Sequence, residues 1–272
     1  MKKIFNYSIL LLLSIVVFGC GESTEPTIDF WSDDGLLNLE ISNEGSATYK
    51  DAPFSGTIVR HFENGQLEYK DDYKDGKRDG VSEEYYESGQ LRAILNYKEG
   101  KTDGVSESYY ENGQLKFKGI LIDGKMDGVT KFYYENGQLK SKKNYEEGEL
   151  DGVFEEYHKN GQLAAKETFK EGEADGVSES YYENGQLKFK MFFNEGIADG
   201  VSESYHDNGQ LFVKAIYKNG EIDGVLKVYH VNGQLAGNSI YKDGELDGVT
   251  EHYDETGELE KKITYKDGKE IK

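Results

Sequence analysis

The stretch DGVSESYYENGQLKFK occupies residues 103–118 and occurs again, unchanged, at 175–190. The glycine of its ENGQ turn recurs every 24 residues, without insertion or deletion, through the remainder of the chain. These glycines are Gly65, Gly89, Gly113, Gly137, Gly161, Gly185, Gly209, Gly233 and Gly257. A fixed period of this length is typical of stacked repeats, each of which contacts only its neighbours. The sequence therefore predicts one elongated array rather than a globule.

Each repeat has two strand-like runs separated by turn residues. In the repeat of Gly113, residues 105–110 predict one strand and residues 115–122 a second, with 111–114 between them. Asn-Gly between strand formers is a strong hairpin signal, and it predicts a type I′ turn. The second turn, at 123–128, is longer and supplies two further glycines. Tight and loose turns in alternation predict an antiparallel meander.

The repeated columns predict which face of the sheet packs. Positions are numbered here from the turn glycine of each repeat. Leu stands at +2 in all nine repeats, while Val stands at −8, Tyr at −4, and Tyr or Phe at +8 in eight of nine. Because these offsets are all even, we expect the four side chains to share one packed face. At about 4.8 Å between strands, each repeat should advance the array by about 9.6 Å.

The predicted fold class is all-β. It is an elongated, single-layer antiparallel meander of nine 24-residue β-hairpin repeats at 57–272. Residues 36–56 read as a degenerate unit, with a strand at 37–41, and predict an N-terminal capping hairpin, since terminal units of repeat proteins depart from the consensus. Residues 20–35 are polar and without period, and predict a tether.

Residues 1–19 have the pattern of an export signal, with Lys2 and Lys3 before an apolar run at 9–18. That run is too short for a transmembrane anchor, which needs about 20 residues. Cys20 is the only cysteine, and residues 17–20 resemble a bacterial lipobox, which implies lipidation of Cys20. The expected location is the cell envelope, lipid-anchored, at the outer membrane or cell surface. A plain secretory signal is the alternative.

The charge limits the possible partners. The chain has a formal net charge of −20. Such a surface repels phosphate backbones and anionic lipid, so we expect no nucleic acid and no electrostatic docking on membranes. Basic proteins and cations remain open as partners.

The unit G-x-x-x-x-Y-Y-x-N-G-x-L…Y-x-x-G-x-x-x-G, followed over about 57–271, resembles the MORN repeat in its bacterial variant form. This resemblance implies one hairpin per repeat and a non-enzymatic scaffold. Eukaryotic MORN proteins are associated with protein assembly near membranes, and bacterial relatives often carry an antitoxin label.

Catalysis and metal binding find little support in the sequence. His158, His206 and His230 share position −3, but repeats about 9.6 Å apart cannot bring them to one zinc ion. Aspartates before the second glycines could gather calcium, although Asp-Gly is also what a turn requires. Calcium is therefore disfavoured, no cofactor or metal is expected, and no Ser/His/Asp or Cys/His set indicates an enzyme.

The candidate binding surface is the aromatic row at position −3. It comprises Tyr86, Tyr110, Tyr134, His158, Tyr182, His206 and His230. Aromatic rows can stack on sugars or on apolar groups of proteins. The alternative is that these rings only shield the sheet. The leading hypothesis is a protein-binding scaffold; a glycan-binding or adhesive module and an antitoxin or immunity-type protein are the alternatives.

Overall fold

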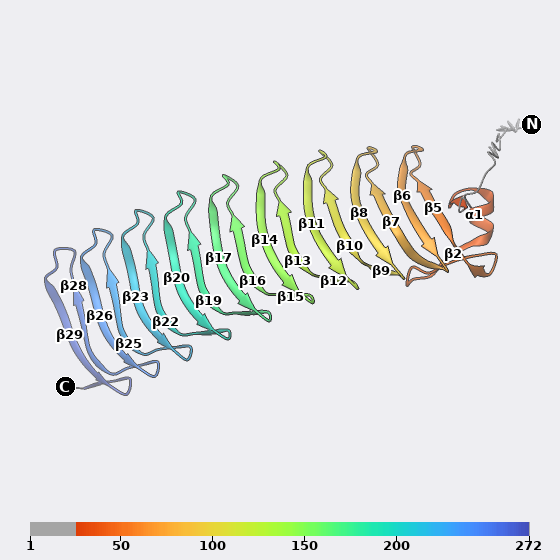
Figure 1. The fold of residues 1–272 in the computed structure, drawn as a ribbon. Coiled ribbons are helices and arrows are strands. Elements are labelled where there is room, and N and C mark those ends of the chain that lie inside the picture. Colours follow the sequence, from red (N-terminus) through yellow and green to blue (C-terminus); the bar gives the residue numbers. More distant parts are fainter. Residues whose placement is uncertain (1–25, 272) are drawn as a thin grey trace, which may run out of the picture.

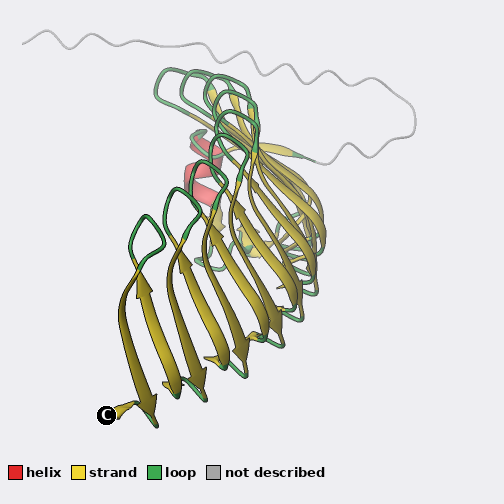
Figure 2. Cartoon of the chain, turned by 90° about the vertical axis from the view of Figure 1, so that its left-hand side faces the viewer, coloured by secondary structure: helices red, strands yellow, loops and turns green. Residues whose placement is uncertain are grey.

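A computed structural model describes residues 26–271, so the predicted signal peptide and Cys20 lie outside it. The chain forms a long ribbon of hairpins that lie side by side in sequence order (Figure 1). The ribbon curves and twists along its length (Figure 2). The predicted all-β meander of nine hairpin repeats is confirmed. The sheet is open and mixed rather than purely antiparallel, because the N-terminal strand pairs parallel to its neighbour.

The nine hairpins share one plan. Their long strands are β5 (Gly56–His61) with β6 (Leu67–Lys74), β7 (Lys77–Tyr85) with β8 (Leu91–Lys98), β10 (Gly104–Tyr109) with β11 (Leu115–Ile122), β13 (Gly128–Tyr133) with β14 (Leu139–Glu146), β16 (Gly152–Tyr157) with β17 (Leu163–Lys170), β19 (Gly176–Tyr181) with β20 (Leu187–Asn194), β22 (Gly200–Tyr205) with β23 (Leu211–Lys218), β25 (Gly224–Tyr229) with β26 (Leu235–Lys242), and β28 (Gly248–Tyr253) with β29 (Leu259–Lys266). Short strands follow most second turns: β9 (Lys101–Thr102), β12 (Lys125–Met126), β15 (Glu149–Leu150), β18 (Glu173–Ala174), β21 (Ile197–Ala198), β24 (Glu221–Ile222), β27 (Glu245–Leu246) and β30 (Lys269–Ile271).

The two kinds of turn differ from the predicted assignment. In the repeat of Gly113, only the glycine has a positive φ (+83°), and its N–H donates to the carbonyl of Tyr110 at 2.9 Å. This is a type I turn closed by a left-handed glycine, so the predicted type I′ turn is wrong here. The type I′ geometry occurs at the second turn instead, where Asp123 (φ 50°) and Gly124 (φ 85°) are both left-handed.

A β-bulge in every hairpin changes the predicted packing face. In β10–β11, Ser108 pairs with Phe117 but Tyr109 pairs with Leu115, so one extra residue lies between Leu115 and Phe117. The bulge shifts the alternation by one. Positions −8, −4 and +2 therefore share one face, called here the Tyr face, whereas +8 lies on the opposite face. The prediction that all four rows share a face is wrong for +8.

The burial of the two faces also differs from the prediction. Val105 on the Tyr face is 42% exposed, whereas its neighbour Ser106 on the opposite face is 2% exposed. The small residue at position −7 is likewise buried in four other repeats, where it is Ser82, Thr130, Ser202 or Thr250. The expectation of a buried valine row is therefore wrong. Gly119, the cross-strand partner of Ser106, lies close to the side chains of Phe117 and Thr130, so neighbouring side chains cover this face.

The N-terminal cap is larger than predicted. β1 (Thr27–Asp29) pairs parallel with β5, and α1 (Asp33–Asn38) begins at Ser32, whose hydroxyl accepts the Gly35 N–H at 3.0 Å. The predicted tether is therefore folded from residue 27 onward. The predicted strand at 37–41 is also shortened by α1. β2 (Leu39–Ile41) pairs with β3 (Ala47–Tyr49) as the expected hairpin, and β4 (Ala52–Pro53) completes a separate sheet.

The cap and the first hairpin together hold most of the buried hydrophobic residues of the described chain. They form one cluster: Ile28, Leu39, Ala47, Phe54, Ile58 and Tyr73. Backbone hydrogen bonds join this cap to the second turn of the first repeat. The Ala47 N–H donates to the Gly76 carbonyl, and the Gly76 N–H donates to the Phe54 carbonyl. The repeats beyond have no comparable core, so contacts between neighbouring hairpins must hold them together.

Candidate binding surface

The −3 row lies beside the Asn-Gly turns, and each of its seven predicted members is half-buried. Each of these side chains reaches the next repeat. There it forms a hydrogen bond with the backbone carbonyl of that repeat's tyrosine at −4. The acceptor distances are 2.8 Å for Tyr86, Tyr110, Tyr134 and Tyr182, 2.9 Å for His158 and His230, and 3.4 Å for His206. The row therefore has a structural role, since its hydrogen bonds connect successive repeats.

The three histidines have the same role as the tyrosines. In each, Nε2 faces the carbonyl that a tyrosine hydroxyl faces elsewhere. Since a carbonyl oxygen only accepts, Nε2 must carry the proton. His and Tyr are interchangeable here because both place a donor at the end of a flat ring. Within residues 26–271, no three His, Cys, Asp or Glu side chains are placed to hold one metal ion.

The rings of the −3 row are also covered along the array. Lysine ammonium groups from position +3 lie 5.7 Å from the Tyr110 ring centroid and 5.6 Å from that of Tyr182. The His206 ring lies 4.7 Å from that of Phe212, at the same +3 position. These contacts leave less free aromatic surface than an exposed stacking platform would offer.

A second set of bonds runs parallel to the −3 row. The Asn112 side chain accepts from the Gln114 N–H at 2.9 Å and donates to the Glu135 carbonyl of the next repeat at 2.9 Å. Asn64, Asn160, Asn184, Asn208 and Asn232 donate to the next repeat in the same way. Asparagine is thus required for its amide, which crosses between repeats, rather than for a positive φ.

On the Tyr face, carboxylates at −6 bind a tyrosine and a lysine. Glu203 accepts the Tyr205 hydroxyl at 2.8 Å and pairs with Lys214 at 2.8 Å. The lysine, and then the hydroxyl, lower the pKa of Glu203. Burial and the hydrogen bond to Glu203 raise the pKa of Tyr205 to about 12. The same trio recurs with Glu107, Glu179 and Glu251. No acid–base role follows, because the carboxylate is engaged by both partners.

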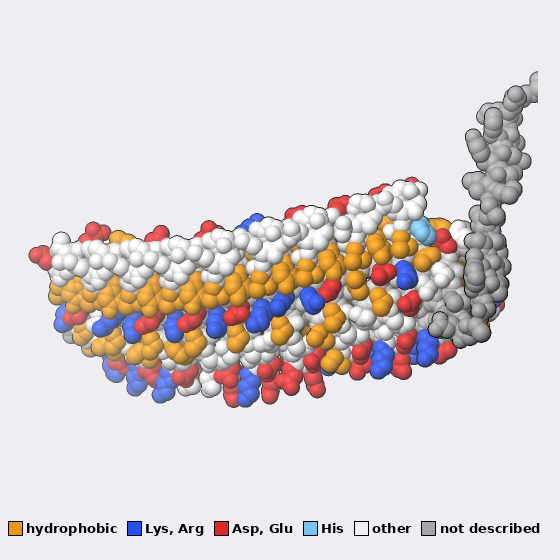
Figure 3. Space-filling model, turned by 45° about the horizontal axis from the view of Figure 1, so that its top comes forward, with side chains coloured by type: hydrophobic (Ala, Val, Ile, Leu, Met, Phe, Trp, Pro, Cys, Tyr) orange, Lys and Arg blue, Asp and Glu red, His pale blue; other side chains and the backbone are white. Residues whose placement is uncertain are grey.

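The Tyr face carries a regular surface pattern (Figure 3). A continuous hydrophobic band borders the Asn-Gly edge, and a row of alternating acidic and basic side chains lies beside it. Beyond that row, positions −8 and +7 form a second apolar row, called here the apolar row. Its exposed members are Val81, Val105, Ile120, Val129, Phe192, Ile216, Val225 and Ile240. No described element packs over them.

The comparisons agree with this architecture. The model of the MORN repeat variant family matches residues 55–75, 78–99, 102–121, 126–147, 150–171, 174–195, 198–219 and 246–267, well over half of the chain. The chain belongs to the MORN repeat variant family. The structure adds a repeat that this MORN model does not match, because β25 and β26 form the same hairpin between 219 and 246. No curated protein matches the chain. None of the helices described in residues 26–271 could cross a membrane.

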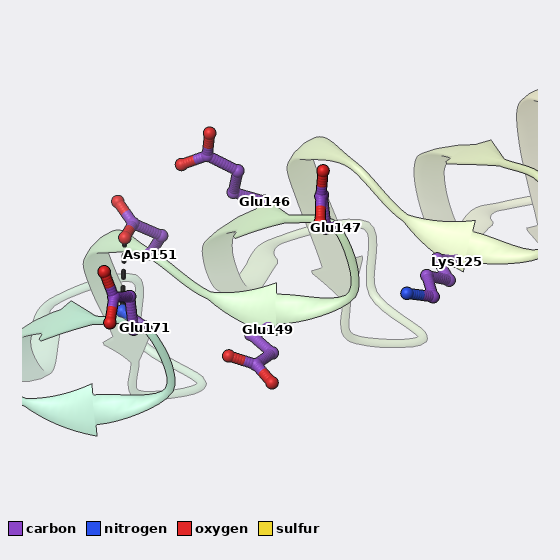
Figure 4. Close-up of a pocket in the computed structure, with 6 residues that line it drawn as sticks. All are labelled: Lys125, Glu146, Glu147, Glu149, Asp151 and Glu171. Carbon is purple, nitrogen blue, oxygen red and sulfur yellow. Dashed lines mark hydrogen bonds between the residues drawn. The ribbon is translucent and has the colours of Figure 1, made fainter.

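The second-turn edge of the MORN array is rich in carboxylates. Glu146, Glu147, Glu149, Asp151 and Glu171 surround a shallow hollow with Lys125 at its far end (Figure 4). Asp151 accepts the Glu171 N–H at 3.2 Å, the bond drawn in Figure 4. Asp79 and Asp127 accept from the corresponding residues of their own repeats. The predicted aspartate row is therefore explained by turn formation.

Sequence reasoning found the −3 row but missed the apolar row. Because the offsets of the four repeated columns are all even, valine at −8 was assigned to the packed face, and its exposure was not expected. A usable signal was present at position +7, which changes from polar to apolar along the array. Such a change becomes visible only when the residues at one position are compared for how they differ between repeats, and not only for what they share.

Proposed function

We propose that this MORN protein is a non-enzymatic, lipid-anchored envelope protein whose repeat array binds a protein partner. The observation that supports binding is the apolar row on the Tyr face. Ile216 is 41% exposed and Ile120 42% exposed, although both lie mid-strand. Contiguous exposed apolar residues on a soluble surface favour an interaction site.

Rigidity supports the same proposal. Each of the seven repeats from that of Gly89 to that of Gly233 is tied to the next by a side chain at −3, and most of them also by the asparagine at −1. The apolar row is therefore held at a regular spacing of about two strands per repeat. A pre-organised surface binds at a lower entropic cost than a flexible one.

The anchor part of the proposal rests on the lipobox-like residues before Cys20. The cap and the first hairpin form one end of the ribbon and β29 the other (Figure 1). A lipid on Cys20 would thus hold the array by its capped end and leave its length accessible. Intact-mass analysis tests this part: the native protein should carry a diacylglycerol adduct that Cys20→Ser abolishes. An unmodified native Cys20 would refute it.

Binding is tested by photo-crosslinking in the organism that makes the protein. A photoreactive residue is placed at Val105 or at Ile216 of the apolar row, and at Glu111 in an Asn-Gly turn as the control. We expect a discrete crosslinked protein from the row and none from the turn. Equal labelling from all three positions, or no adduct from the row, would refute the proposal.

The glycan-binding alternative receives less support. The hydroxyls of Tyr110 and Tyr182 donate to backbone carbonyls, and lysines flank their rings. These groups are therefore not free to bind sugar hydroxyls. The antitoxin or immunity alternative is a special case of protein binding, and identification of the crosslinked protein decides it.

A further inference from the structure

Two columns change character along the array, and the two changes overlap in three repeats of its C-terminal half. Position +7 reads Asp72, Asn96, Ile120, Asn144 and Thr168, then Phe192, Ile216 and Ile240, then Thr264. Position +12 reads Lys77, Lys101 and Lys125, then Glu149, Glu173, Ile197, Glu221 and Glu245, then Lys269. The repeats of Gly185, Gly209 and Gly233 are therefore the only described consecutive ones with an apolar +7 and no lysine at +12.

The fold does not require these changes. The hairpin β22–β23 has the same register and bulge as β10–β11 in the N-terminal half. Lys101, moreover, pairs with Asp123 of the next repeat at 3.6 Å, a neutralisation that glutamate at +12 cannot make. Glu173 instead borders a hollow with Glu171, Asp175 and Glu195, in which Lys170 is the one basic residue. Like charges in proximity cost stability, which favours a role in binding.

The backbone brings the apolar and acidic side chains together. The Asp199 N–H donates to the Phe192 carbonyl at 2.9 Å, and the Asp223 N–H donates to the Ile216 carbonyl at 2.9 Å. Phe192 and Ile216 thus each have an aspartate beside them, whereas the aspartate beside Ile240, Asp247, pairs with Lys266 at 2.8 Å. Phe192 is 36% exposed, Ile216 41% and Ile240 36%, and Ile197 adds apolar surface at the same edge. We call these three repeats the C-terminal patch.

We infer that the C-terminal patch is the docking site for an extended, cationic protein segment that has a basic residue at every third position. This inference rests on the proposed protein-binding function and names its partner chemistry. The apolar row would take the partner's apolar side chains, and Asp199, Asp223 and the glutamates at +12 its basic ones. Charge complementarity on this scale directs orientation and speeds association.

The spacing of the patch determines the spacing in the partner. Equivalent residues in neighbouring repeats are two strands, about 9.6 Å, apart. Three residues of an extended chain in the polyproline II conformation make one turn and span about 9.3 Å, so basic residues at every third position lie on one side and meet one repeat each. A segment of about nine residues would cover the three repeats.

The test uses the full-length protein and a fluorescent peptide of three consecutive Lys-Leu-Ser units. The control peptide has three Glu-Leu-Ser units. We expect anisotropy to show binding of the lysine peptide alone, weakening steeply with added salt. Phe192→Ser combined with Ile216→Ser should weaken binding by at least about tenfold, because the apolar contact is lost. Asn144→Ser, in the same column but outside both the patch and the apolar row, should leave the affinity unchanged.

The charge requirement has its own matched pair of variants. The double variant Glu221→Lys with Glu245→Lys has lysine at +12 in two repeats of the patch. Three N-terminal repeats already carry lysine at this position, so folding should be preserved. This variant should weaken peptide binding by about tenfold, since it removes the complementary charge. Lys101→Glu with Lys125→Glu should not weaken it.

Several outcomes would overturn the inference. These are equal binding of the two peptides, equal loss in Asn144→Ser, and no binding of the lysine peptide. If the photo-crosslinked partner is still captured by the patch variants, the proposed function stands and the patch is not its site. A dimer in sedimentation that Phe192→Ser with Ile216→Ser dissociates would assign the patch to a second copy instead.

Discussion

The −3 position shows how one residue can fit two interpretations. An aromatic residue that recurs once per repeat favours both a binding row and a structural row. The Tyr182 hydroxyl bonds to the next repeat's backbone at 2.8 Å, and His158 makes the equivalent bond at 2.9 Å. What the position requires is a ring with a donor at its tip. Phe62, at −3 of the first repeat, has no such donor.

We expect Tyr182→Phe to lower the free energy of unfolding by about 1 kcal/mol, because one carbonyl between repeats loses its donor. Urea denaturation followed by circular dichroism measures the change. The reciprocal variant Phe62→Tyr should raise stability, since it supplies the missing hydroxyl to the next repeat. An unchanged midpoint in both variants would show that the −3 bonds contribute nothing.

The Glu203–Tyr205–Lys214 trio predicts a pH dependence. The pKa of Glu203 is lowered in the folded chain, so its stabilisation is present above the unfolded value of about 4.3 and is lost as pH falls. The pKa of Tyr205 is raised to about 12, so its stabilisation is present below about 10 and is lost as pH rises towards 12. The stability difference between the native chain and Glu203→Gln should therefore be constant from about pH 5 to 10 and shrink outside that range. Urea midpoints across pH measure it, and a difference that persists at pH 3 would contradict the pairing.

At the scale of the element, the type I′ geometry predicted for the Asn-Gly turn is found at the second turn instead. The Asn-Gly turn uses its asparagine to reach the next repeat, and only its glycine is left-handed. The second turn places a non-glycine residue at positive φ in every repeat, such as Glu171 (φ 51°) and Asn219 (φ 49°). Asparagine tolerates this conformation better than glutamate does.

These turns offer a matched pair of variants. Glu171→Asn should stabilise the fold by about 0.5 kcal/mol, because the left-handed conformation costs asparagine less. Asn219→Glu should destabilise it by a similar amount for the same reason. Thermal or urea unfolding measures both. Shifts of the same sign would mean that edge charge, rather than backbone conformation, dominates at this turn.

At the scale of the whole molecule, the cap and the array are stabilised differently. The cap packs on the first hairpin through a buried cluster that includes Phe54, Ile58 and Tyr73, whereas the later repeats hold one another by hydrogen bonds along two rows. A chain of this kind has approximately additive stability, because each repeat interacts only with its neighbours. The array should therefore tolerate the loss of whole repeats.

Deletion of 104–151 or of 176–223 removes two repeats and joins an aspartate to a second-turn glycine in each case. We expect both shortened chains to stay folded, with a smaller urea m-value in proportion to the surface lost. Only the deletion of 176–223, which removes most of the C-terminal patch, should abolish binding of the lysine peptide. Loss of binding in both would place the site elsewhere or make it depend on length.

The sequence predicted the hairpin array accurately and the packing of its faces poorly. The period and the two strand runs per repeat required only local patterns, and the nine hairpins follow them. The +8 row was assigned to the wrong face because the bulge at Lys116 has no distinctive residue. Likewise, the helix at 33–38 and the parallel strand β1 form through contacts near the N-terminal end of the array. These segments occur once in the chain, so no repeated pattern predicts them.

The amino-acid sequence by itself determined the repeat length, the number of hairpins and the acidic charge, because these follow from composition and from patterns within 24 residues. The tertiary structure alone decided what the −3 row does, since its donors find their acceptors only when successive repeats are stacked. It also decided that none of the valines at −8 is buried and that half of them are exposed. Burial depends on how the ribbon bends and which neighbours surround a side chain, and no single repeat contains that information.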